Sequence, residues 1–130
     1  MFFGNISDPI YHPQFIEIVE EMGNTSVERL QIHTNGSHKS MDWWKKFVEV
    51  TNKQKYYTVM YFGIDGIDEK TAIHRKNQKF QESWDAMIYC KENMNPAKSL
   101  IIWLFFDAQP KLILIALFII LSSTLIALST

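Results

Sequence analysis

The chain has 130 residues, the size of one small domain, and 47% of them are hydrophobic, enough to form a core. Lysine and arginine number 13 and aspartate and glutamate 14, so the net charge of -1 provides neither a basic field for a nucleic acid nor an acidic tail. The single cysteine, Cys90, excludes an internal disulfide, and we expect a buried helical thiol rather than a reactive one. No secretory signal opens the sequence, so we expect the body of the protein to be cytoplasmic.

Residues 1–3 are apolar and are followed at once by the turn-forming sequence GNISDP, which predicts a short buried strand that ends at the turn. A helix is expected over residues 12–22, with Pro13 in its first turn and Gly23 as its C-cap. Its apolar residues recur at helical spacing: Phe15, Ile16, Ile18, Val19 and Met22.

The next segments alternate between strand and helix patterns. Residues 27–34 predict a strand that ends at the turn dipeptide Asn35-Gly36, and Ser40 is suited to cap the helix that follows. That helix has an apolar stripe formed by Trp43, Trp44, Phe47 and Val48. The run YYTVMYFGID then predicts a strand buried on both faces.

A third helix and a fourth strand complete the alternation. Asn77 is placed to cap the helix, and the residues in helical register are Phe80, Trp84, Met87, Ile88 and Lys91. Residues 99–106, SLIIWLFF, predict the strand. Strands that alternate with helices favour a parallel sheet joined by right-handed crossovers, so the expected fold class is α/β.

Each predicted strand runs into a polar or glycine-rich turn: GNISDP, TNGS, GIDGIDE and FDAQP. In a parallel sheet these turns meet at one edge, where the ligands of α/β folds bind. The alternative is that such turns are polar in any α/β fold and bind nothing. The sequence lacks the serine-hydrolase motif G-x-S-x-G, the P-loop motif and paired Cys/His zinc ligands.

The composition changes sharply after Pro110. Residues 112–128, LILIALFIILSSTLIAL, contain no charge, and as a helix they would span about 25 Å, slightly less than the hydrocarbon thickness of a bilayer. We therefore divide the chain into a body, residues 1–110, and an apolar C-terminal helix, residues 111–130. We expect this helix to be a transmembrane anchor with the body on the cytoplasmic side. The alternatives are a buried core helix and a non-native tail from a shifted reading frame, both of which leave the protein cytoplasmic.

Four sequence pieces occur in order, each at the end of a predicted strand: GNISDPIYHPQFIEIVEEM, IHTNGS with DWWKKF, YFGIDG and IHRKNQKFQESWD. Over residues 3–106 they resemble the core of the radical S-adenosylmethionine enzymes. The resemblance implies a partial (β/α) barrel, of which this chain would be an incomplete fragment with parallel strands. It also implies a [4Fe–4S] cluster that cleaves S-adenosylmethionine to a 5′-deoxyadenosyl radical.

The resemblance places the cofactor contacts at the strand ends. Asp8 stands where the family has the acid that holds the methionine amino group, and an ammonium group is suited to a carboxylate. Arg75 aligns with an arginine that reaches the cofactor carboxylate, although it can equally be a solvated residue near a helix start. The residues that the resemblance assigns to S-adenosylmethionine are Asn5, Ser7, Asp8, Asn35, Asp65 and Arg75.

The chain also departs from the family pattern. Ser7 replaces a glycine, which puts the tightness of its loop in question, and Gly63 replaces a serine whose hydroxyl could touch the cofactor. The family holds its cluster with Cys-x-x-x-Cys-x-x-Cys after the first barrel strand, whereas this sequence has only Cys90 and four histidines without a common ligand spacing. We therefore expect no cluster on this chain. Since Met1 lies at the family's second strand, we expect it to mark an internal start or a truncated reading frame.

Three functions are consistent with this sequence. The leading expectation is a remnant of a radical S-adenosylmethionine enzyme that is inactive alone or depends on a complementing chain for the missing strands and cluster. The second is a cluster-free module that binds S-adenosylmethionine or a nucleotide. The third is a tail-anchored membrane protein without catalysis. No nucleic-acid partner is expected.

Overall fold

Four parallel strands form the centre of the molecule. The computed structural model describes residues 1–4, 7–64 and 79–104. Its strands are β1 (Phe2–Phe3), β2 (Arg29–Thr34), β3 (Tyr57–Gly63) and β4 (Ser99–Leu104). They pair in the order in which they occur in the sequence, and every pairing is parallel. The predicted α/β class with parallel strands is therefore confirmed, in the form of an open sheet.

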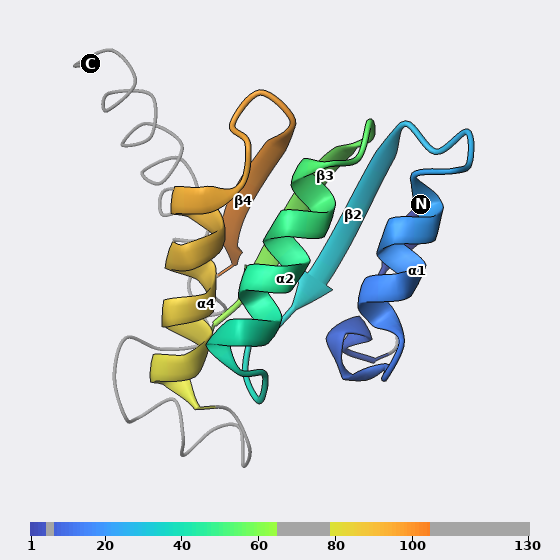
Figure 1. The fold of residues 1–130 in the computed structure, drawn as a ribbon. Coiled ribbons are helices and arrows are strands. Elements are labelled where there is room, and N and C mark those ends of the chain that lie inside the picture. The colour runs from blue at the N-terminus through green and yellow to red at the C-terminus, as the bar shows by residue number, and fades with distance from the viewer. Residues whose placement is uncertain (5–6, 65–78, 105–130) are drawn as a thin grey trace, which may run out of the picture.

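The helices lie on one face of this sheet. They are α1 (Phe15–Met22), α2 (Met41–Asn52) and α4 (Phe80–Asn93), and in Figure 1 all three lie in front of the strands. Each connection moves one strand further in the same direction, and because such crossovers are right-handed, successive helices fall on the same side. We call the opposite side of the sheet the far face; within the described part of the chain, no helix lies on it.

The segment before α1 differs from the sequence prediction. The helix expected over residues 12–22 begins only at Phe15, and a 3-10 helix, η1 (Pro9–Tyr11), precedes it. His12 ends η1 in extended backbone geometry, so the chain cannot continue directly into an α-helix. Pro13 therefore lies in the turn between the two helices and not in the first turn of α1.

Two of the three predicted helix caps are confirmed. Gly23 ends α1, and the Ser40 hydroxyl accepts the backbone N–H of Trp43 at 3.1 Å at the start of α2. The prediction for α4 was wrong, because its N-cap is Lys79, whose extended backbone starts the helix two residues later than a cap at Asn77 would. Asn77 itself lies outside the described residues.

The core lies between the sheet and the helices. Trp44 and Phe47 of α2 and Phe62 of β3 are buried, and the Trp44 ring contacts the other two. The Tyr56 hydroxyl, just before β3, donates to the carbonyl of Val19 at 2.7 Å and so ties α1 to the sheet. Burial raises the pKa of Tyr56, which keeps this hydroxyl protonated as a donor.

Helix α4 contributes small residues and one thiol to the core. Its buried residues are Ser83, Ala86, Met87 and Cys90. Of the apolar residues predicted in register, Met87 is buried, and Phe80, Trp84 and Ile88 pack partly buried against the core. Cys90 is fully buried, as predicted, and burial raises the pKa of its thiol, which makes it a poor nucleophile.

Alternate residues of each strand point to opposite sides of the sheet. On the helix side, β2 and β3 bury Leu30, Ile32 and Thr34 and, in register with them, Thr58, Met60 and Phe62. The far face carries Arg29, Gln31 and His33 of β2, Tyr57, Val59 and Tyr61 of β3, and Leu100, Ile102 and Leu104 of β4. Four β3 residues alternate onto the far face, namely Tyr57, Val59, Tyr61 and Gly63, and only Val59 of these is buried, so the prediction that β3 is buried on both faces was partly wrong.

A lysine just before β4 hydrogen-bonds to the end of α2. Lys98 Nζ donates to the backbone carbonyls of Asn52 at 2.8 Å and of Gln54 at 2.6 Å. Asn52 is the last residue of α2, so the ammonium group satisfies a helix-terminal carbonyl and opposes the negative end of the helix dipole. This contact ties β4 to α2 at the end of the sheet where the strands begin, opposite the end that carries the loops after β1, β2 and β3.

The predicted C-terminal helix lies beyond the described residues. The body boundary at residue 110 and the apolar segment 112–128 both follow Leu104, the last described position. In the described part of the chain, no helix combines the length and apolarity that crossing a bilayer requires. The transmembrane anchor therefore stays a prediction.

Replacing Phe47 with alanine should test the helix-side core. The ring is fully buried, so its loss should lower the free energy of unfolding by about 3–5 kcal/mol, measured by urea denaturation. Lys46→Ala, at an exposed position of the same helix, should change it by less than about 0.5 kcal/mol. Equal effects of the two substitutions would contradict the packing described here.

Candidate functional site

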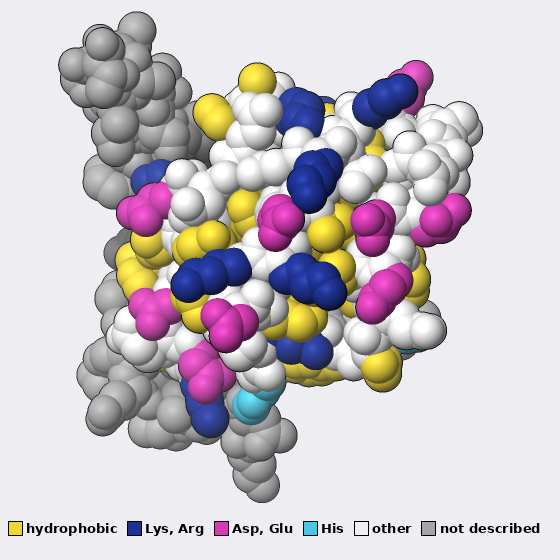
Figure 2. All heavy atoms as spheres, viewed as in Figure 1, with side chains coloured by type: hydrophobic (Ala, Val, Ile, Leu, Met, Phe, Trp, Pro, Cys, Tyr) yellow, Lys and Arg dark blue, Asp and Glu magenta, His cyan; other side chains and the backbone are white. Residues whose placement is uncertain are grey.

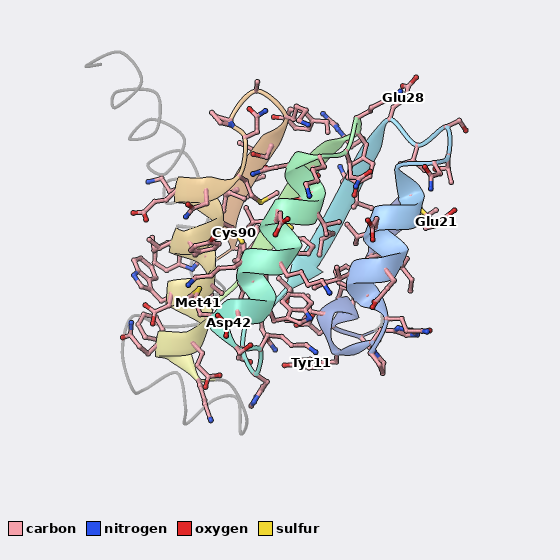
Figure 3. The ribbon with its side chains drawn as sticks, viewed as in Figure 1. Tyr11, Glu21, Glu28, Met41, Asp42 and Cys90 are labelled. Atoms are coloured by element: carbon pink, nitrogen blue, oxygen red, sulfur yellow. The ribbon has the colours of Figure 1, made fainter. Side chains whose placement is uncertain are left out.

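The ends of the parallel strands meet at one edge of the sheet. Gly4 follows β1, Asn35 follows β2 and Ile64 follows β3, and the parallel register brings these positions to the same side. In Figure 3, Tyr11 and the first residue of α2, Met41, both lie toward this end of the molecule. This is the edge at which the sequence predicted a ligand site.

Asp8 joins the loops that follow β1 and β2. Its Oδ2 atom accepts the Thr34 hydroxyl at 2.9 Å and the backbone N–H of Asn35 at 2.8 Å, and its Oδ1 atom accepts the backbone N–H of Ile10 at 3.2 Å. Among the described residues, Oδ2 therefore accepts two hydrogen bonds and Oδ1 one, whereas a carboxylate can accept about four in all. Asp8 is therefore mainly a clamp between two loops.

The Asn35 side chain is also held by the protein. Its Oδ1 atom accepts the backbone N–H and the hydroxyl of Ser37 at 2.8 and 2.7 Å, and its Nδ2 atom donates to the Tyr11 hydroxyl at 3.2 Å. Tyr11 is 45% exposed, and its ring meets the His38 imidazole edge-on at 6.0 Å between centroids. The edge thus presents an exposed aromatic ring beside a fixed amide.

Two glycines at this edge have backbone conformations that favour glycine. Gly4 has φ +115°, and a Cβ atom on it would lie 2.6 Å from the carbonyl oxygen of His33, so the close approach of the two backbones also excludes a side chain. Gly36 has φ +76°, and a Cβ atom on it would lie 3.0 Å from the Phe62 ring. A substitution at either position would be strained, because L side chains rarely adopt these positive φ angles.

A carboxylate links the β2–α2 loop to the start of α4. His38 has φ +68°, which non-glycine residues rarely adopt, and its backbone N–H donates to Glu82 Oε2 at 3.0 Å. This hydrogen bond, helped by Lys79 Nζ at 3.4 Å from Oε1, lowers the pKa of Glu82 below its usual value. Glu82 therefore stabilises a backbone conformation that would otherwise be unfavourable.

Among the described residues, two buried side-chain polar atoms near the starts of α2 and α4 have no hydrogen-bond partner within the protein. They are Nε1 of Trp44 and Oγ of Ser83, both in residues that are almost fully buried. A buried donor without a partner costs about 1–3 kcal/mol of desolvation.

The structure brings together two of the six residues that the sequence assigned to the cofactor. Asp8 and Asn35 are hydrogen-bonded to each other, and Ser7 is exposed beside Asp8. The other three, Asn5, Asp65 and Arg75, lie outside the described residues. Sequence reasoning did not find Tyr11 or Glu82, whose roles depend on contacts across 24 and 44 residues of chain.

The described residues do not fit an iron–sulfur cluster. Cys90, the one thiol, is fully buried in the core rather than placed at the candidate edge. Across residues 1–4, 7–64 and 79–104, no three potential metal-ligating side chains gather at one place.

Charges of both signs are mixed across the helix-covered face. Figure 2 shows lysine and arginine side chains interspersed with aspartate and glutamate across this face.

Comparison with known proteins found no similarity: no family model, no curated protein and no solved structure matches this chain. A function must therefore be inferred from the candidate edge itself.

Acid unfolding should report the contact between Glu82 and His38. Because folding lowers the pKa of Glu82 below its ordinary value of 4.5, its contribution to stability is fully present above that pH and is lost as the pH falls through the lower folded pKa. The stability difference between the wild type and Glu82→Gln should therefore shrink between about pH 6 and about pH 3, measured by urea denaturation. Glu92→Gln, at an exposed position of the same helix, should follow the wild type. A difference that stays constant with pH would contradict the role of the carboxylate.

Proposed function

We propose that the chain is part of a radical S-adenosylmethionine-type barrel that retains cofactor-binding strand ends and lacks the cluster-binding cysteines. The observation that carries this proposal is the hydrogen-bonded pair of Asp8 and Asn35 at the ends of adjacent parallel strands. The strand order supports it, since strands that follow one another with helices on one side only are typical of (β/α) barrels.

The chain's own residues then bind the cofactor without cleaving it. In the intact family a [4Fe–4S] cluster supplies the electron for cleavage, and the described residues of this chain do not fit one. Asp8 Oδ1 would hold the ammonium group, and Tyr11, whose hydroxyl is hydrogen-bonded to Asn35, would offer a ring that is 45% exposed. Catalysis would need a complementing chain that provides the remaining strands and the three cysteines.

Binding of labelled S-adenosylmethionine to the full chain tests this function. We expect a dissociation constant below about 1 mM by equilibrium dialysis, and a loss of at least about tenfold in Asp8→Asn, because the amide cannot neutralise the ammonium group.

Thr34→Val is the matched control for the loop. It removes the hydroxyl that donates to Asp8 but keeps the carboxylate, so it should weaken binding less than Asp8→Asn. Equal losses in both variants would show that only the loop geometry matters, and binding weaker than millimolar in the wild type would overturn the proposal.

We propose, as a second function, that residues 112–128 anchor the body to a membrane, since these residues carry no charge. Membranes of cells that express the full chain should retain it after carbonate at high pH and release it in detergent. Replacing Ile119 and Ile120 with aspartate should move the protein to the carbonate-soluble fraction, because two charges at the centre of a span are costly. Release of the wild type by carbonate would exclude a spanning helix.

A further inference from the structure

The loop between β2 and α2, residues 35–40, contains two positions with positive φ. Gly36 has φ +76° and His38 has φ +68°, and only the first of them is a glycine. A positive φ is unfavourable for a residue with a side chain, and such residues persist where the surrounding structure holds them in place. The conformation at His38 therefore depends on contacts that stabilise it.

Glu82 provides one of these contacts from the first turn of α4. Its Oε2 atom accepts the backbone N–H of His38 at 3.0 Å, across 44 residues of chain. Its Oε1 atom lies 3.4 Å from Lys79 Nζ, at the start of the same helix. The carboxylate is thus held between the loop and α4, and it fixes the loop at its strained residue.

The same loop fixes the polar residues of the candidate edge. Asn35 Oδ1 accepts the backbone N–H and the hydroxyl of Ser37, the neighbour of His38, at 2.8 and 2.7 Å. The Asn35 backbone N–H donates to Asp8 at 2.8 Å, and its Nδ2 atom donates to the Tyr11 hydroxyl at 3.2 Å. A change of backbone conformation at His38 would therefore reach the candidate edge through Ser37 and Asn35.

We propose that Glu82 is a positioning residue for the candidate edge: it holds the β2–α2 loop in the conformation in which Asn35 contacts Asp8. Without this carboxylate the loop relaxes at His38 and releases the Asn35 side chain. The proposal rests on the proposed function for the identity of the ligand. The conformation of the loop itself can be measured without any ligand.

Amide hydrogen exchange in the full chain tests the position of the loop. The reporters are the backbone N–H groups of Gly36 and Ser37, which donate to side-chain oxygens at the end of β2 and in the loop. In Glu82→Ala we expect both to exchange at least about fivefold faster, because the strained loop opens more often. The N–H of Met60, in the centre of the sheet, should keep its rate, since this opening is local.

Replacing His38 with glycine is the matched rescue. Glycine adopts a positive φ without strain, so adding His38→Gly to Glu82→Ala should return both reporters to within about twofold of the wild-type rates. This substitution does not restore the negative charge near the start of α4, so the rescue separates loop strain from a weaker helix. Glu82→Gln keeps an acceptor oxygen and should fall between the wild type and Glu82→Ala.

Glu92→Ala, at an exposed position of α4, is the control for the loss of a carboxylate and should leave the reporters unchanged. Unchanged reporters in Glu82→Ala would overturn the proposal. An equal acceleration of Met60 would also overturn it, because the whole fold would then be opening. The same holds if His38→Gly brings no recovery.

Binding of labelled S-adenosylmethionine connects the loop to the proposed function. Glu82→Ala should weaken binding at least about threefold, and adding His38→Gly should restore it. If the wild type binds and Glu82→Ala binds equally well, the positioning role is overturned although the proposed function stands. If the wild type does not bind, the proposed function fails, and the exchange rates alone support or overturn the control of the loop by Glu82.

Discussion

The rest of the structure depends on one constraint: the four strands pair in the order of the sequence, and every pairing is parallel. Each strand is laid down beside the previous one, always parallel, and right-handed crossovers then place every described helix on the same side. One side of the sheet thus receives the core built around Trp44, Phe47 and Phe62. The other side carries no described helix, and the carboxyl ends of the strands meet at one end of the sheet.

At that edge, internal hydrogen bonds would compete with the binding of any ligand. Asp8 accepts hydrogen bonds from Thr34, Asn35 and Ile10, so a ligand would meet a carboxylate that is already fixed in place. Such a group loses little conformational entropy on binding, but it has little hydrogen-bonding capacity to give. A site of this kind selects by geometry and charge, and its affinity depends on additional contacts from neighbouring loops.

The sequence was sufficient for features that depend on local patterns. The four strands, the Ser40 and Gly23 caps and the buried Cys90 follow from alternation, capping chemistry and helical spacing. The later start of α1 was missed because η1 depends on the conformation of His12, and the contact of Glu82 with His38 was missed because it joins residues 44 positions apart. Periodicity carries no information about such long-range hydrogen bonds. The strand ends suggested that Asp8 and Asn35 would be close, but not that they would bind each other.

Lys98 lies at the other end of the sheet, where β4 begins, and it holds the fold together there. Lys98 fastens the beginning of β4 to the last turn of α2 without help from the loops that surround Asp8. A substitution in those loops therefore leaves this attachment of β4 to α2 in place. The loops keep constraints of their own, since Asp8 joins two of them and Gly4 and Gly36 have backbone conformations that favour glycine. The two ends of the sheet are thus held by separate sets of hydrogen bonds, and a change at one end need not loosen the other.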